Sequence, residues 1–560
     1  MSMARTEYTV RGGVVPAGYS FTRNDHFSGT NNESKRFRVP IVLFRTFAKQ
    51  FQRTHPQRDV VLLSFLCLIG FALYLPGLSA ERFGDDLRLI KDQPASGFFS
   101  GFWRPTPFGF YRPIEASFAA FVQVVFGTQT WPIHLVHLAA TIVISWLVFS
   151  FLLDVGSSRL QAVFGSLFMI ASQANVSAVL GNDTSSQVLD GLFRSLALFC
   201  LYRYFWRTSP TLCNDSIDSR RTKYYSYSLL FFGMALLSKE TAASLLIQVV
   251  ALVILARAIP NVGSRKQRAS LVHVTPFLVI FILYMIARQL IVQPGISVGL
   301  GAEVYQFHIG LNIFKNLVLC LLTVAVPVSS VALYTAAKSV NPLLILFYLS
   351  ATAVFLFTAV YGSRLSSLRN TAGVCACLGA LTFASAIGLN HVSELYAYAA
   401  IPFASVIVGI ALGEIKNAIW HRKSVRAAYF VLVTGLLVSH VIAVQTKSFQ
   451  LVSNGKRAKR LLYQIVPYVR ELPTNGTAVL LNPPGSQLEY SVYRMNGFNV
   501  LLYGGEHRIR QLACRGDISV KIVDAPPRAD PSGGRQDLVL TLSDENVFVL
   551  NPSDILRQHE

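Results

Sequence analysis

Runs of about twenty apolar residues recur along this chain from Val60 to Val444, and they limit the fold more than any other feature. A helix needs ~20 apolar residues to cross ~30 Å of hydrocarbon, so runs of this length are expected to cross a membrane. Of the 560 residues, 52% are hydrophobic and 14% are charged, against about 25% charged in a typical soluble protein. The sequence therefore predicts a polytopic α-helical membrane protein.

The net charge of +21 comes from basic residues that lie mostly in short loops beside the apolar runs. Lys and Arg gather on the cytoplasmic side of membrane proteins, so this charge predicts orientation, and nucleic acid is not expected as a partner. Most of the seven cysteines fall inside apolar runs, and no pair has metal-ligand spacing. His134 and His137 lack a third ligand and are expected to be hydrogen-bonded core histidines, so no metal site is predicted.

Three regions are expected along the chain. Residues 1–58 form a cytoplasmic basic tail, and within it residues 37–55 place aromatic side chains on one helical face and basic ones on the other. That pattern fits a helix lying on the membrane surface, and an ordinary juxtamembrane basic segment explains it equally well. Residues 59–446 are expected to form the transmembrane domain, and residues 447–560 a small extracytoplasmic α/β domain. Its strands are expected at 477–482, 499–503, 519–524, 538–542 and 547–550.

The stretch from Tyr224 to Arg257 is too long for one span. As one helix it would measure about 50 Å at ~1.5 Å per residue, against ~30 Å of hydrocarbon, with Lys239 and Glu240 at its centre. A break at Ser238–Thr241 places both charges at a membrane boundary, and this break is predicted. The other spans are expected at about 59–78, 131–153, 160–180, 187–205, 271–292, 343–361, 370–389, 396–415 and 427–446.

Residues 311–334 leave the number of spans open, because this apolar run is broken by Pro327 and flanked by lysines. Counted as a full span, the run makes about twelve and places the C-terminal domain inside the cell. The basic loops at 364–369 and 416–426 favour the opposite orientation, with the run re-entrant, about eleven full spans and the C-terminal domain outside. About thirteen spans is the upper count, reached if another stretch is split.

The loop at 79–130 follows the first span and is the expected catalytic loop. It is long, aromatic and rich in proline, so short helices in the outer membrane interface are expected there. Asp85 and Asp86 lie at its start, where a carboxylate could act as a base beside the membrane surface or cap an interfacial helix. Arg112 near its end could hold a phosphate or lock Asp86 in place, and the sequence does not favour either role.

Further polar groups are expected on the same outer face. The Lys239 ammonium could bind a phosphate or merely mark the end of a span. Glu240 is expected to have a different partner, because adjacent helical residues do not face each other. Asp183 and Glu394 lie in later outer loops and are candidate walls of the site, or ordinary polar loop residues. The gathering of these clusters on one face is the signal for a site.

Five short motifs follow one another along the chain. They are Phe83-Gly84-Asp85-Asp86, Tyr111-Arg112-Pro113-Ile114, His134-Leu135-Val136-His137, Ser238-Lys239-Glu240-Thr241 and Glu394-Leu395-Tyr396-Ala397-Tyr398. In this order they resemble the GT-C fold glycosyltransferases that use polyprenyl-phosphate sugars. The closest resemblance is to the protein O-mannosyltransferase-like branch, which includes the membrane portion of transmembrane-and-TPR proteins. The likeness covers residues 60–260 well and 260–446 loosely.

The resemblance implies an inverting transfer of a sugar from a polyprenyl-phosphate carrier to an acceptor hydroxyl outside the cytoplasm. Asp85 or Asp86 would be the base, and Lys239 with Arg112 would hold the donor phosphate. Leu395 stands where the family often has Arg, so a phosphate contact assigned to that Arg is not carried over. An α/β domain replaces the TPR tail, so the choice of acceptor is not carried over either. The supporting residues are expected to be Glu240, Glu394, Asp183, Tyr111 and His134.

No cofactor is expected to be required, because cations already cover the donor phosphate; the family includes metal-using relatives, so a divalent cation stays open. The expected partners are the lipid-linked sugar, a lipid, glycan or protein acceptor, and the membrane, which we expect to be a bacterial inner membrane. Two other classes stay open, a transporter or flippase of a lipid-linked sugar and an inactive scaffold of envelope assembly. A transporter usually has repeats and charges near mid-membrane, and the sequence shows neither pattern.

Overall fold

The chain divides into two units, Met1–Val61 and Leu62–Glu560, and the first is described only from Pro56 onward, as the start of helix α2 (Pro56–Tyr74). The expected surface helix at 37–55 lies outside the described residues, and so does Asp85. The computed structural model describes residues 56–84, 86–87, 97–106, 109–206, 214–258, 270–292, 308–325, 342–389, 393–419, 423–483, 493, 495–502, 504–524, 537–543 and 546–550.

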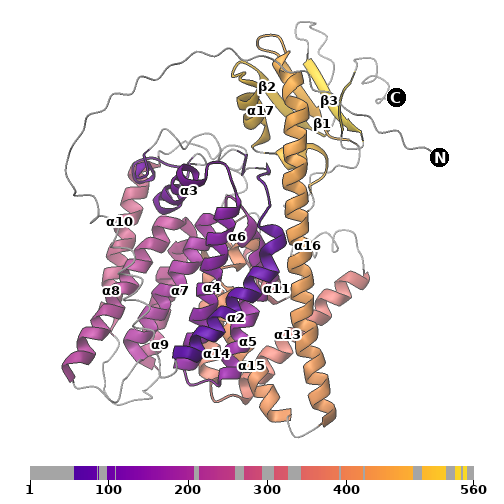
Figure 1. Cartoon of the computed structure of the whole chain (residues 1–560). Coiled ribbons are helices and arrows are strands. Elements are labelled where there is room, and N and C mark those ends of the chain that lie inside the picture. Colours follow the sequence, from indigo (N-terminus) through magenta and orange to yellow (C-terminus); the bar gives the residue numbers. More distant parts are fainter. Residues whose placement is uncertain are drawn as a thin grey trace, which may run out of the picture. The chain divides into compact units, whose positions relative to one another are not determined.

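Long apolar helices make up most of the second unit (Figure 1). In the described part of the chain, 5 helices are long and apolar enough to cross a membrane, or up to 6 if a bent pair counts as one span. The chain is therefore an integral membrane protein, and the total of about eleven to thirteen spans stays a prediction. The candidate spans are Val60–Gly77, Trp131–Asp154, Glu240–Arg257, Leu271–Ile291 and Arg426–Arg470.

The helices begin where the apolar runs begin, and local chemistry fixes several of these starts. Proline occupies the first turn of α3, α4 and α10, where its missing N–H costs no helical hydrogen bond. Ser158 and Gln161 form a reciprocal capping box at the start of α5. After α2, the helices are α3 (Pro113–Phe126), α4 (Trp131–Asp154), α5 (Arg159–Ala171), α6 (Val176–Leu180), α7 (Ser185–Trp206), α8 (Asn214–Ser238), α9 (Ser244–Ala258), α10 (Thr275–Ile291), α11 (Leu311–Ala325), α13 (Pro342–Leu365), α14 (Arg369–Thr382), α15 (Ile401–Ile419) and α16 (Lys423–Arg470).

Two breaks interrupt the apolar helices. The predicted span at 160–180 is bent by 42° where α5 gives way to the 3-10 turn η4 (Gln173–Asn175) and then to α6. The predicted break near Lys239 is confirmed: α8 ends at Ser238, Lys239 is extended, and the 3-10 turn η5 (Glu240–Ala243) leads into α9. Of the ambiguous run 311–334, α11 covers the part to Ala325, and the rest lies outside the described residues.

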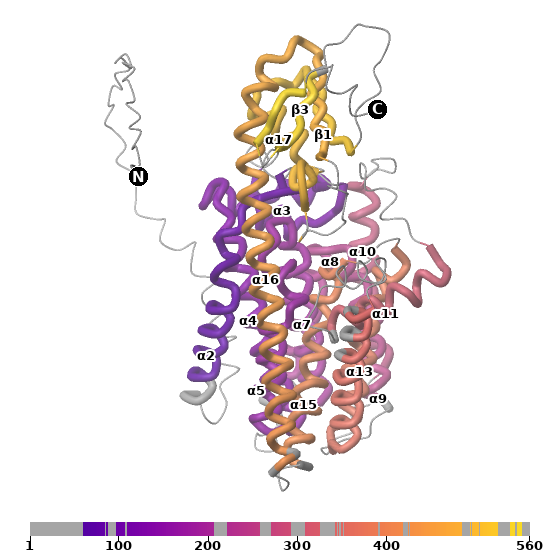
Figure 2. Tube along the Cα trace, turned by 90° about the vertical axis from the view of Figure 1, so that its right-hand side faces the viewer, coloured from indigo at the N-terminus to yellow at the C-terminus, as the bar shows by residue number. Residues whose placement is uncertain are grey.

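Glycines allow close helix packing in the bundle. Figure 2 shows α5 and α15 side by side. A Cβ added at Gly409 would lie 2.5 Å from the Gln161 carbonyl oxygen, and one at Gly165 would lie 2.9 Å from the Ser405 carbonyl oxygen. Small residues thus let the two backbones touch, as they do between helices in membranes.

A single helix of 48 residues, α16, continues from the bundle to the C-terminal domain (Figure 1). It packs against α5, α6 and α15 in the bundle and against α17 (Gly505–Ala513) and the last strand in the C-terminal domain. The predicted domain boundary at residue 447 therefore falls within one continuous helix.

The C-terminal domain is a small α/β fold, as predicted. Its sheet has the order β2-β1-β3-β4, with β1 parallel to β2 and β3, and β3 and β4 joined as an antiparallel hairpin. All five residues of β1 are buried, which is typical of a central strand. The strands are β1 (Thr477–Leu481), β2 (Ser519–Val523), β3 (Asp537–Ser543) and β4 (Asn546–Val549).

The strand predicted at 499–503 is wrong. That apolar run begins within the 3-10 helix η10 (Gly497–Leu501), all of whose residues are buried. The Asn482 side chain accepts a hydrogen bond from the Phe498 N–H at 2.7 Å, so a side chain satisfies backbone that a sheet would otherwise pair. The run is apolar because it is buried. A short buried helix and a short buried strand look alike in hydropathy, so the sequence pattern could not distinguish them.

Candidate active site

A bidentate ion pair joins two stretches that are 128 residues apart. Arg112, just before α3, donates from Nε to Glu240 Oε2 at 2.7 Å and from Nη2 to Glu240 Oε1 at 2.6 Å. The guanidinium also lies over the Phe110 ring, with Cζ 4.1 Å from the ring centroid. Because two parallel bonds fix the plane of the guanidinium, the end of the first loop is held beside the α8–α9 break.

Glu115 is a second acidic partner of Arg112, and the sequence analysis missed it. Its Oε2 lies 3.4 Å from Arg112 Nη1, and its Oε1 accepts from the Ser186 N–H at 3.3 Å, at the start of α7. Burial raises the pKa of the Glu115 carboxyl, and Arg112 is the largest charge opposing that rise. Lys239, Glu240 and Asp183 act on the same carboxylate. The signal was its spacing, i+3 from Arg112 across the start of α3.

The Lys239 ammonium lies beside this cluster and forms no ion pair with a described residue. The residue is 8% exposed, and Nζ lies 5.9 Å from the centroid of the Tyr396 ring. Within the described part of the chain, its Nζ makes neither a hydrogen bond nor an ion pair at bonding distance, and Glu240 is bound to Arg112 instead. The expectation that Lys239 and Glu240 would not form a simple pair is confirmed.

Asp86 lies at the same end of the bundle. It is 5% exposed, and its Oδ2 accepts from Asn182 Nδ2 at 3.1 Å. Burial lowers the pKa of the nearby Arg82 guanidinium, and the Asp86 carboxylate opposes that shift. The residue after Asn182 is Asp183, which acts on Glu115 as described above. The predicted clusters of the first loop, the α6–α7 loop and the α8–α9 break therefore converge.

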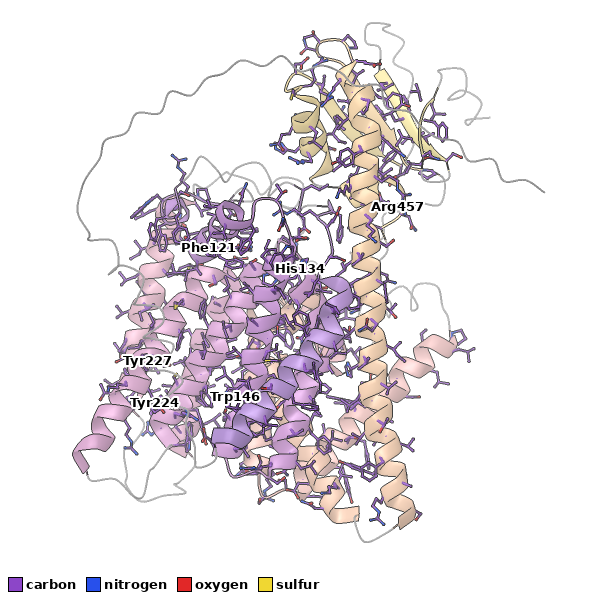
Figure 3. All side chains as sticks on the ribbon, in the orientation of Figure 1. Phe121, His134, Trp146, Tyr224, Tyr227 and Arg457 are labelled. Carbon is purple, nitrogen blue, oxygen red and sulfur yellow. The ribbon has the colours of Figure 1, made fainter. Side chains whose placement is uncertain are left out.

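The two histidines are core residues, as predicted. His134 is 0% exposed and His137 is 1% exposed. His134 Nδ1 lies 3.0 Å from the Leu78 carbonyl oxygen, and His137 Nε2 lies 2.9 Å from Ser185 Oγ. Figure 3 shows His134 at the end of α4 that is nearer α3. Both rings therefore hold loop segments next to the site by hydrogen bonds. Across the described ranges, no three metal-ligating side chains come together.

Tyrosines line the other side of the Arg112–Glu240 pair. Tyr111 stacks on Tyr284 of α10 with the ring centroids 6.0 Å apart. Tyr284 is 5% exposed, and its hydroxyl is buried without a hydrogen-bond partner among the described residues. Glu240, Arg288 and Arg112 are its charged neighbours. Sequence reasoning missed Tyr284 and Arg288, because an apolar helix gives no sign of which of its faces meets the loop.

Glu394, a candidate wall of the site, binds a residue of α16. It forms a buried ion pair with Lys447 of α16, with Nζ 2.7 Å from Oε2. Lys447 also donates to Gln173 and lies over the Tyr493 ring, 4.8 Å from its centroid. The turn η9 (Glu394–Ala397) thus presents Tyr396 to Lys239 and Glu394 to α16. Glu394 bonds Lys447 rather than Lys239, so its place among the supporting residues of the site stays a prediction.

Comparison with known proteins was made by sequence and by structure. No protein-family model matches the chain, and no curated protein matches it. Its structure is similar to that of ArnT from Cupriavidus metallidurans in the apo state, at 14% identity and a TM-score of 0.48, covering 84% of this chain and 86% of that one. The form of ArnT bound to undecaprenyl phosphate gives 14% identity and a TM-score of 0.46, covering 85% and 89%.

The chain is also similar to the oligosaccharyltransferase of Archaeoglobus fulgidus tethered with an acceptor peptide. The identity is 13% and the TM-score 0.45, covering 85% of this chain and 64% of that one. Both proteins are GT-C glycosyltransferases, the class that the motifs resemble. With every TM-score below 0.5, these likenesses carry no inference about the reaction or the substrates of this chain, and the O-mannosyltransferase-like branch stays a prediction.

The arrangement itself has a definite chemical capacity. A buried carboxylate, Asp86, can accept a proton from a hydroxyl, while the Lys239 ammonium can stabilise negative charge on a departing phosphate. The acidic side chains nearest Lys239 are partly neutralised by Arg112, so they do not cancel its charge. A carboxylate for the proton and a separate ammonium for the phosphate are the two groups that transfer from a phosphate-linked donor could use.

Proposed function

We propose that the chain is a membrane glycosyltransferase that moves a sugar from a polyprenyl-phosphate carrier to an acceptor hydroxyl on the extracytoplasmic face. The observation that carries this proposal is the state of Lys239. Its buried ammonium makes no ion pair with any described residue, because the adjacent Glu240 binds Arg112. A buried cation without an ion-pair partner is costly, and an anionic ligand would offset that cost. A lipid phosphate is the anion found at a membrane boundary.

The proposed reaction is a single displacement. The acceptor oxygen forms a bond to the anomeric carbon while the bond from that carbon to the donor phosphate oxygen breaks, which inverts the configuration. Asp86 or its neighbour Asp85 takes the proton of the acceptor hydroxyl. The polyprenyl phosphate leaves with the electron pair of the broken bond, and Lys239 stabilises the charge that develops on it.

Arg112 takes a different role from the phosphate binding that the resemblance implied. Its fork is engaged by Glu240 and its Nη1 by Glu115 and Ser186. We assign it as a positioning residue that holds Glu240 away from Lys239. Tyr111, Tyr284 and Asp183 are proposed as walls of the donor site. We further propose that the C-terminal domain lies outside the cytoplasm of a bacterial inner membrane, on the same face as Asp86.

The test of this function is sugar transfer by the purified full-length protein in lipid vesicles. Labelled polyprenyl-phosphate sugars are supplied together with an envelope extract as the acceptor source, and label entering a new glycosidic product is measured. Asp86→Asn and Asp85→Asn are compared with wild type. We expect one of them to lower the transfer rate by at least ~100-fold, because loss of a general base typically costs 10²–10⁴-fold.

The control is Lys459→Ala, which removes an exposed ion pair with Glu81 on the same face and is expected to leave transfer unchanged. Wild-type rates in both aspartate variants would refute the assignment of the base. Movement of label across the vesicle without a new bond would favour a flippase instead. An arm with a metal chelator tests the expectation that no divalent cation is required, since transfer should then persist.

A further inference from the structure

A further buried ion pair lies within helix α7, near the candidate site. Asp190 and Arg194 form a bidentate pair, with Arg194 Nε 3.2 Å from Oδ1 and Nη2 3.1 Å from Oδ2. Asp190 is 0% exposed and Arg194 is 1% exposed. Buried charges inside a membrane helix are costly, and where they occur they generally serve function. Replacing a buried pair by apolar residues is often neutral for stability, so stability alone does not explain its presence.

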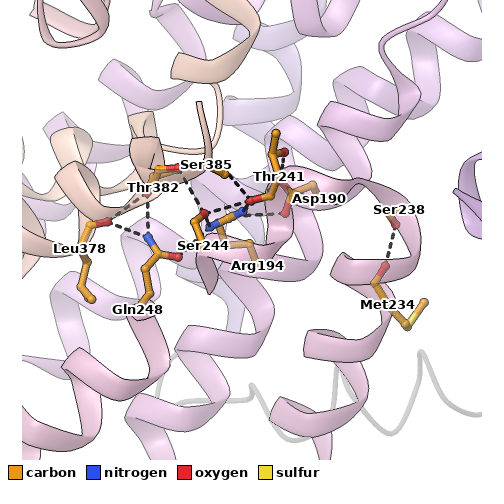
Figure 4. Close-up of polar contacts among 10 residues, drawn as sticks. All are labelled: Asp190, Arg194, Met234, Ser238, Thr241, Ser244, Gln248, Leu378, Thr382 and Ser385. Carbon is orange, nitrogen blue, oxygen red and sulfur yellow. Dashed lines mark hydrogen bonds and ion pairs between the residues drawn. The ribbon is translucent and has the colours of Figure 1, made fainter. Parts of the chain in front are cut away.

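The pair holds one residue of the α8–α9 break from two sides (Figure 4). Arg194 Nη2 donates to the Thr241 carbonyl oxygen at 3.2 Å, and the Thr241 hydroxyl donates to Asp190 Oδ2 at 3.3 Å. Ser385, from the segment after α14, donates to the same carbonyl at 3.1 Å. Main chain and side chain of Thr241 are therefore both fixed, two residues after Lys239.

Further hydrogen bonds tie this contact to two neighbouring helices. Arg194 Nη1 donates to Ser244 Oγ at 3.0 Å and to Gln248 Oε1 at 2.8 Å, both at the start of α9. Gln248 Nε2 then donates at 2.7 Å to Thr382 Oγ1 of α14 (Figure 4). One guanidinium thus connects α7, the break, α9 and, through Gln248, α14.

The network contacts the chain where its regular helical hydrogen bonds are interrupted. Lys239 is extended, with φ −156° and ψ 140°, so the regular hydrogen-bond ladder stops there and backbone carbonyls lose their helical partners. The Thr241 carbonyl oxygen keeps one backbone partner, the Ser244 N–H. The side-chain donors that converge on the same oxygen fix it further, and so they restrict the path of the chain directly after Lys239.

We propose that Asp190 and Arg194 are positioning residues that clamp the backbone at Thr241 and so hold the Lys239 ammonium in place for the donor phosphate. The inference deepens the proposed function and rests on its phosphate site at Lys239. It assigns no contact with the substrate to either residue. Arg194 acts through Lys239, so its contribution should vanish when Lys239 is absent.

Helix α7 supplies a matched control. Arg203 is also buried, at 1% exposed, and also pairs with an aspartate, with Nη2 2.8 Å from Asp154 Oδ2. It lies nine residues further along α7, about 13 Å at ~1.5 Å per residue, toward the end remote from the site. Arg→Lys at either position keeps the charge and removes the planar fork.

The experiment measures the affinity of the full-length protein in lipid nanodiscs for undecaprenyl phosphate, with undecaprenol as the probe that lacks phosphate. We expect Lys239→Ala to weaken phosphate-dependent binding at least ~10-fold, Arg194→Lys by about 5- to 10-fold, and Arg203→Lys by less than about 2-fold. In the Lys239→Ala background, Arg194→Lys should add nothing, because coupled residues are non-additive. Ser385→Ala, a single hydroxyl deletion, provides a milder second variant with the same pattern.

The outcomes separate the two proposals. If Lys239→Ala weakens binding but Arg194→Lys behaves like Arg203→Lys, the clamp is wrong and the proposed function stands. If Arg194→Lys weakens binding equally with and without Lys239, the effect is general destabilisation and the clamp is again wrong. If Lys239→Ala leaves binding unchanged, the phosphate site fails, and the clamp fails with it. The expected non-additive pattern supports the clamp.

Discussion

At the scale of single residues, the site depends on which carboxylate each cationic side chain binds. Arg112 could have bound phosphate, yet its fork is engaged by Glu240, while the Lys239 ammonium forms no ion pair among the described residues. Arg is better suited to this positioning role because its rigid fork matches a carboxylate, whereas Lys is a compact point charge suited to a phosphate. The pairing thus leaves Arg112 to hold Glu240 and leaves Lys239 available for the proposed phosphate.

This division predicts an unusual rescue. Arg112→Met frees Glu240 to approach Lys239, so the KM for the lipid-linked donor should rise about 10-fold. Arg112→Met combined with Glu240→Met removes the competing carboxylate, and most of the donor affinity should return. Donor KM in the vesicle assay measures both effects. A double variant that is as weak as Arg112→Met alone would mean that Arg112 contacts the phosphate itself.

Several of these residues were predictable and their partners were not. Hydropathy and charge located the break at Lys239 and placed Asp86, Arg112 and Glu240 on one face, because a span must match the membrane thickness. The same reasoning says nothing about which helices are neighbours. The contact of Arg112 with Glu240, across 128 residues, and the position of Tyr284 depend on that lateral arrangement, so the sequence could not show them.

At the scale of elements, α16 shows how one helix fixes the start of the loop at 79–130. A Cβ added at Gly455 of α16 would lie 2.5 Å from the Glu81 carbonyl oxygen and 2.8 Å from the Glu81 N. Glu81 lies five residues before Asp86, near the start of the loop at 79–130. The backbone of α16 is therefore in contact with the start of the loop at 79–130, and only glycine allows this approach.

Two glycines of α16 make this contact testable. Gly455→Ala should lower the free energy of unfolding by about 1–3 kcal/mol, because the new methyl group overlaps backbone atoms. Gly435→Ala should raise it by up to about 1 kcal/mol, because alanine favours helix and no described heavy atom lies within 4 Å of the new Cβ. Denaturant unfolding of both variants in the same detergent measures the difference. Equal effects would show that α16 does not press on the loop.

At the scale of the whole molecule, a buried polar network joins the bundle to the C-terminal domain. Lys447 of α16 binds Glu394 before α15 and Gln173 at the α5–α6 bend. Tyr493 of the C-terminal domain contacts Ser177 of α6 through its hydroxyl, and burial raises its pKa well above the ordinary value, so it stays a neutral phenol. This network connects α16, the turn before α15, the α5–α6 bend and the C-terminal domain. Hydropathy alone shows these only as separate segments.

The network predicts a structural role for Glu394. Lys447→Met leaves the Glu394 carboxylate buried without its ammonium partner, which should cost about 3–5 kcal/mol of stability. Adding Glu394→Gln removes the unpaired charge and should restore much of that loss. Thermal unfolding measures stability, and donor KM should change by less than about 2-fold in the folded double variant. A large rise in donor KM would mean that Glu394 serves the site directly.

The unbroken helix α16 also has a mechanical consequence. Its 48 residues make a rod about 70 Å long at ~1.5 Å per residue, with one end in the bilayer and the other beneath the sheet. Tilting a rod of that length by about 5° displaces its far tip by about 6 Å. Helices tilt to match the thickness of the lipid around them. A thicker or thinner bilayer would therefore displace the C-terminal domain at the far end of α16.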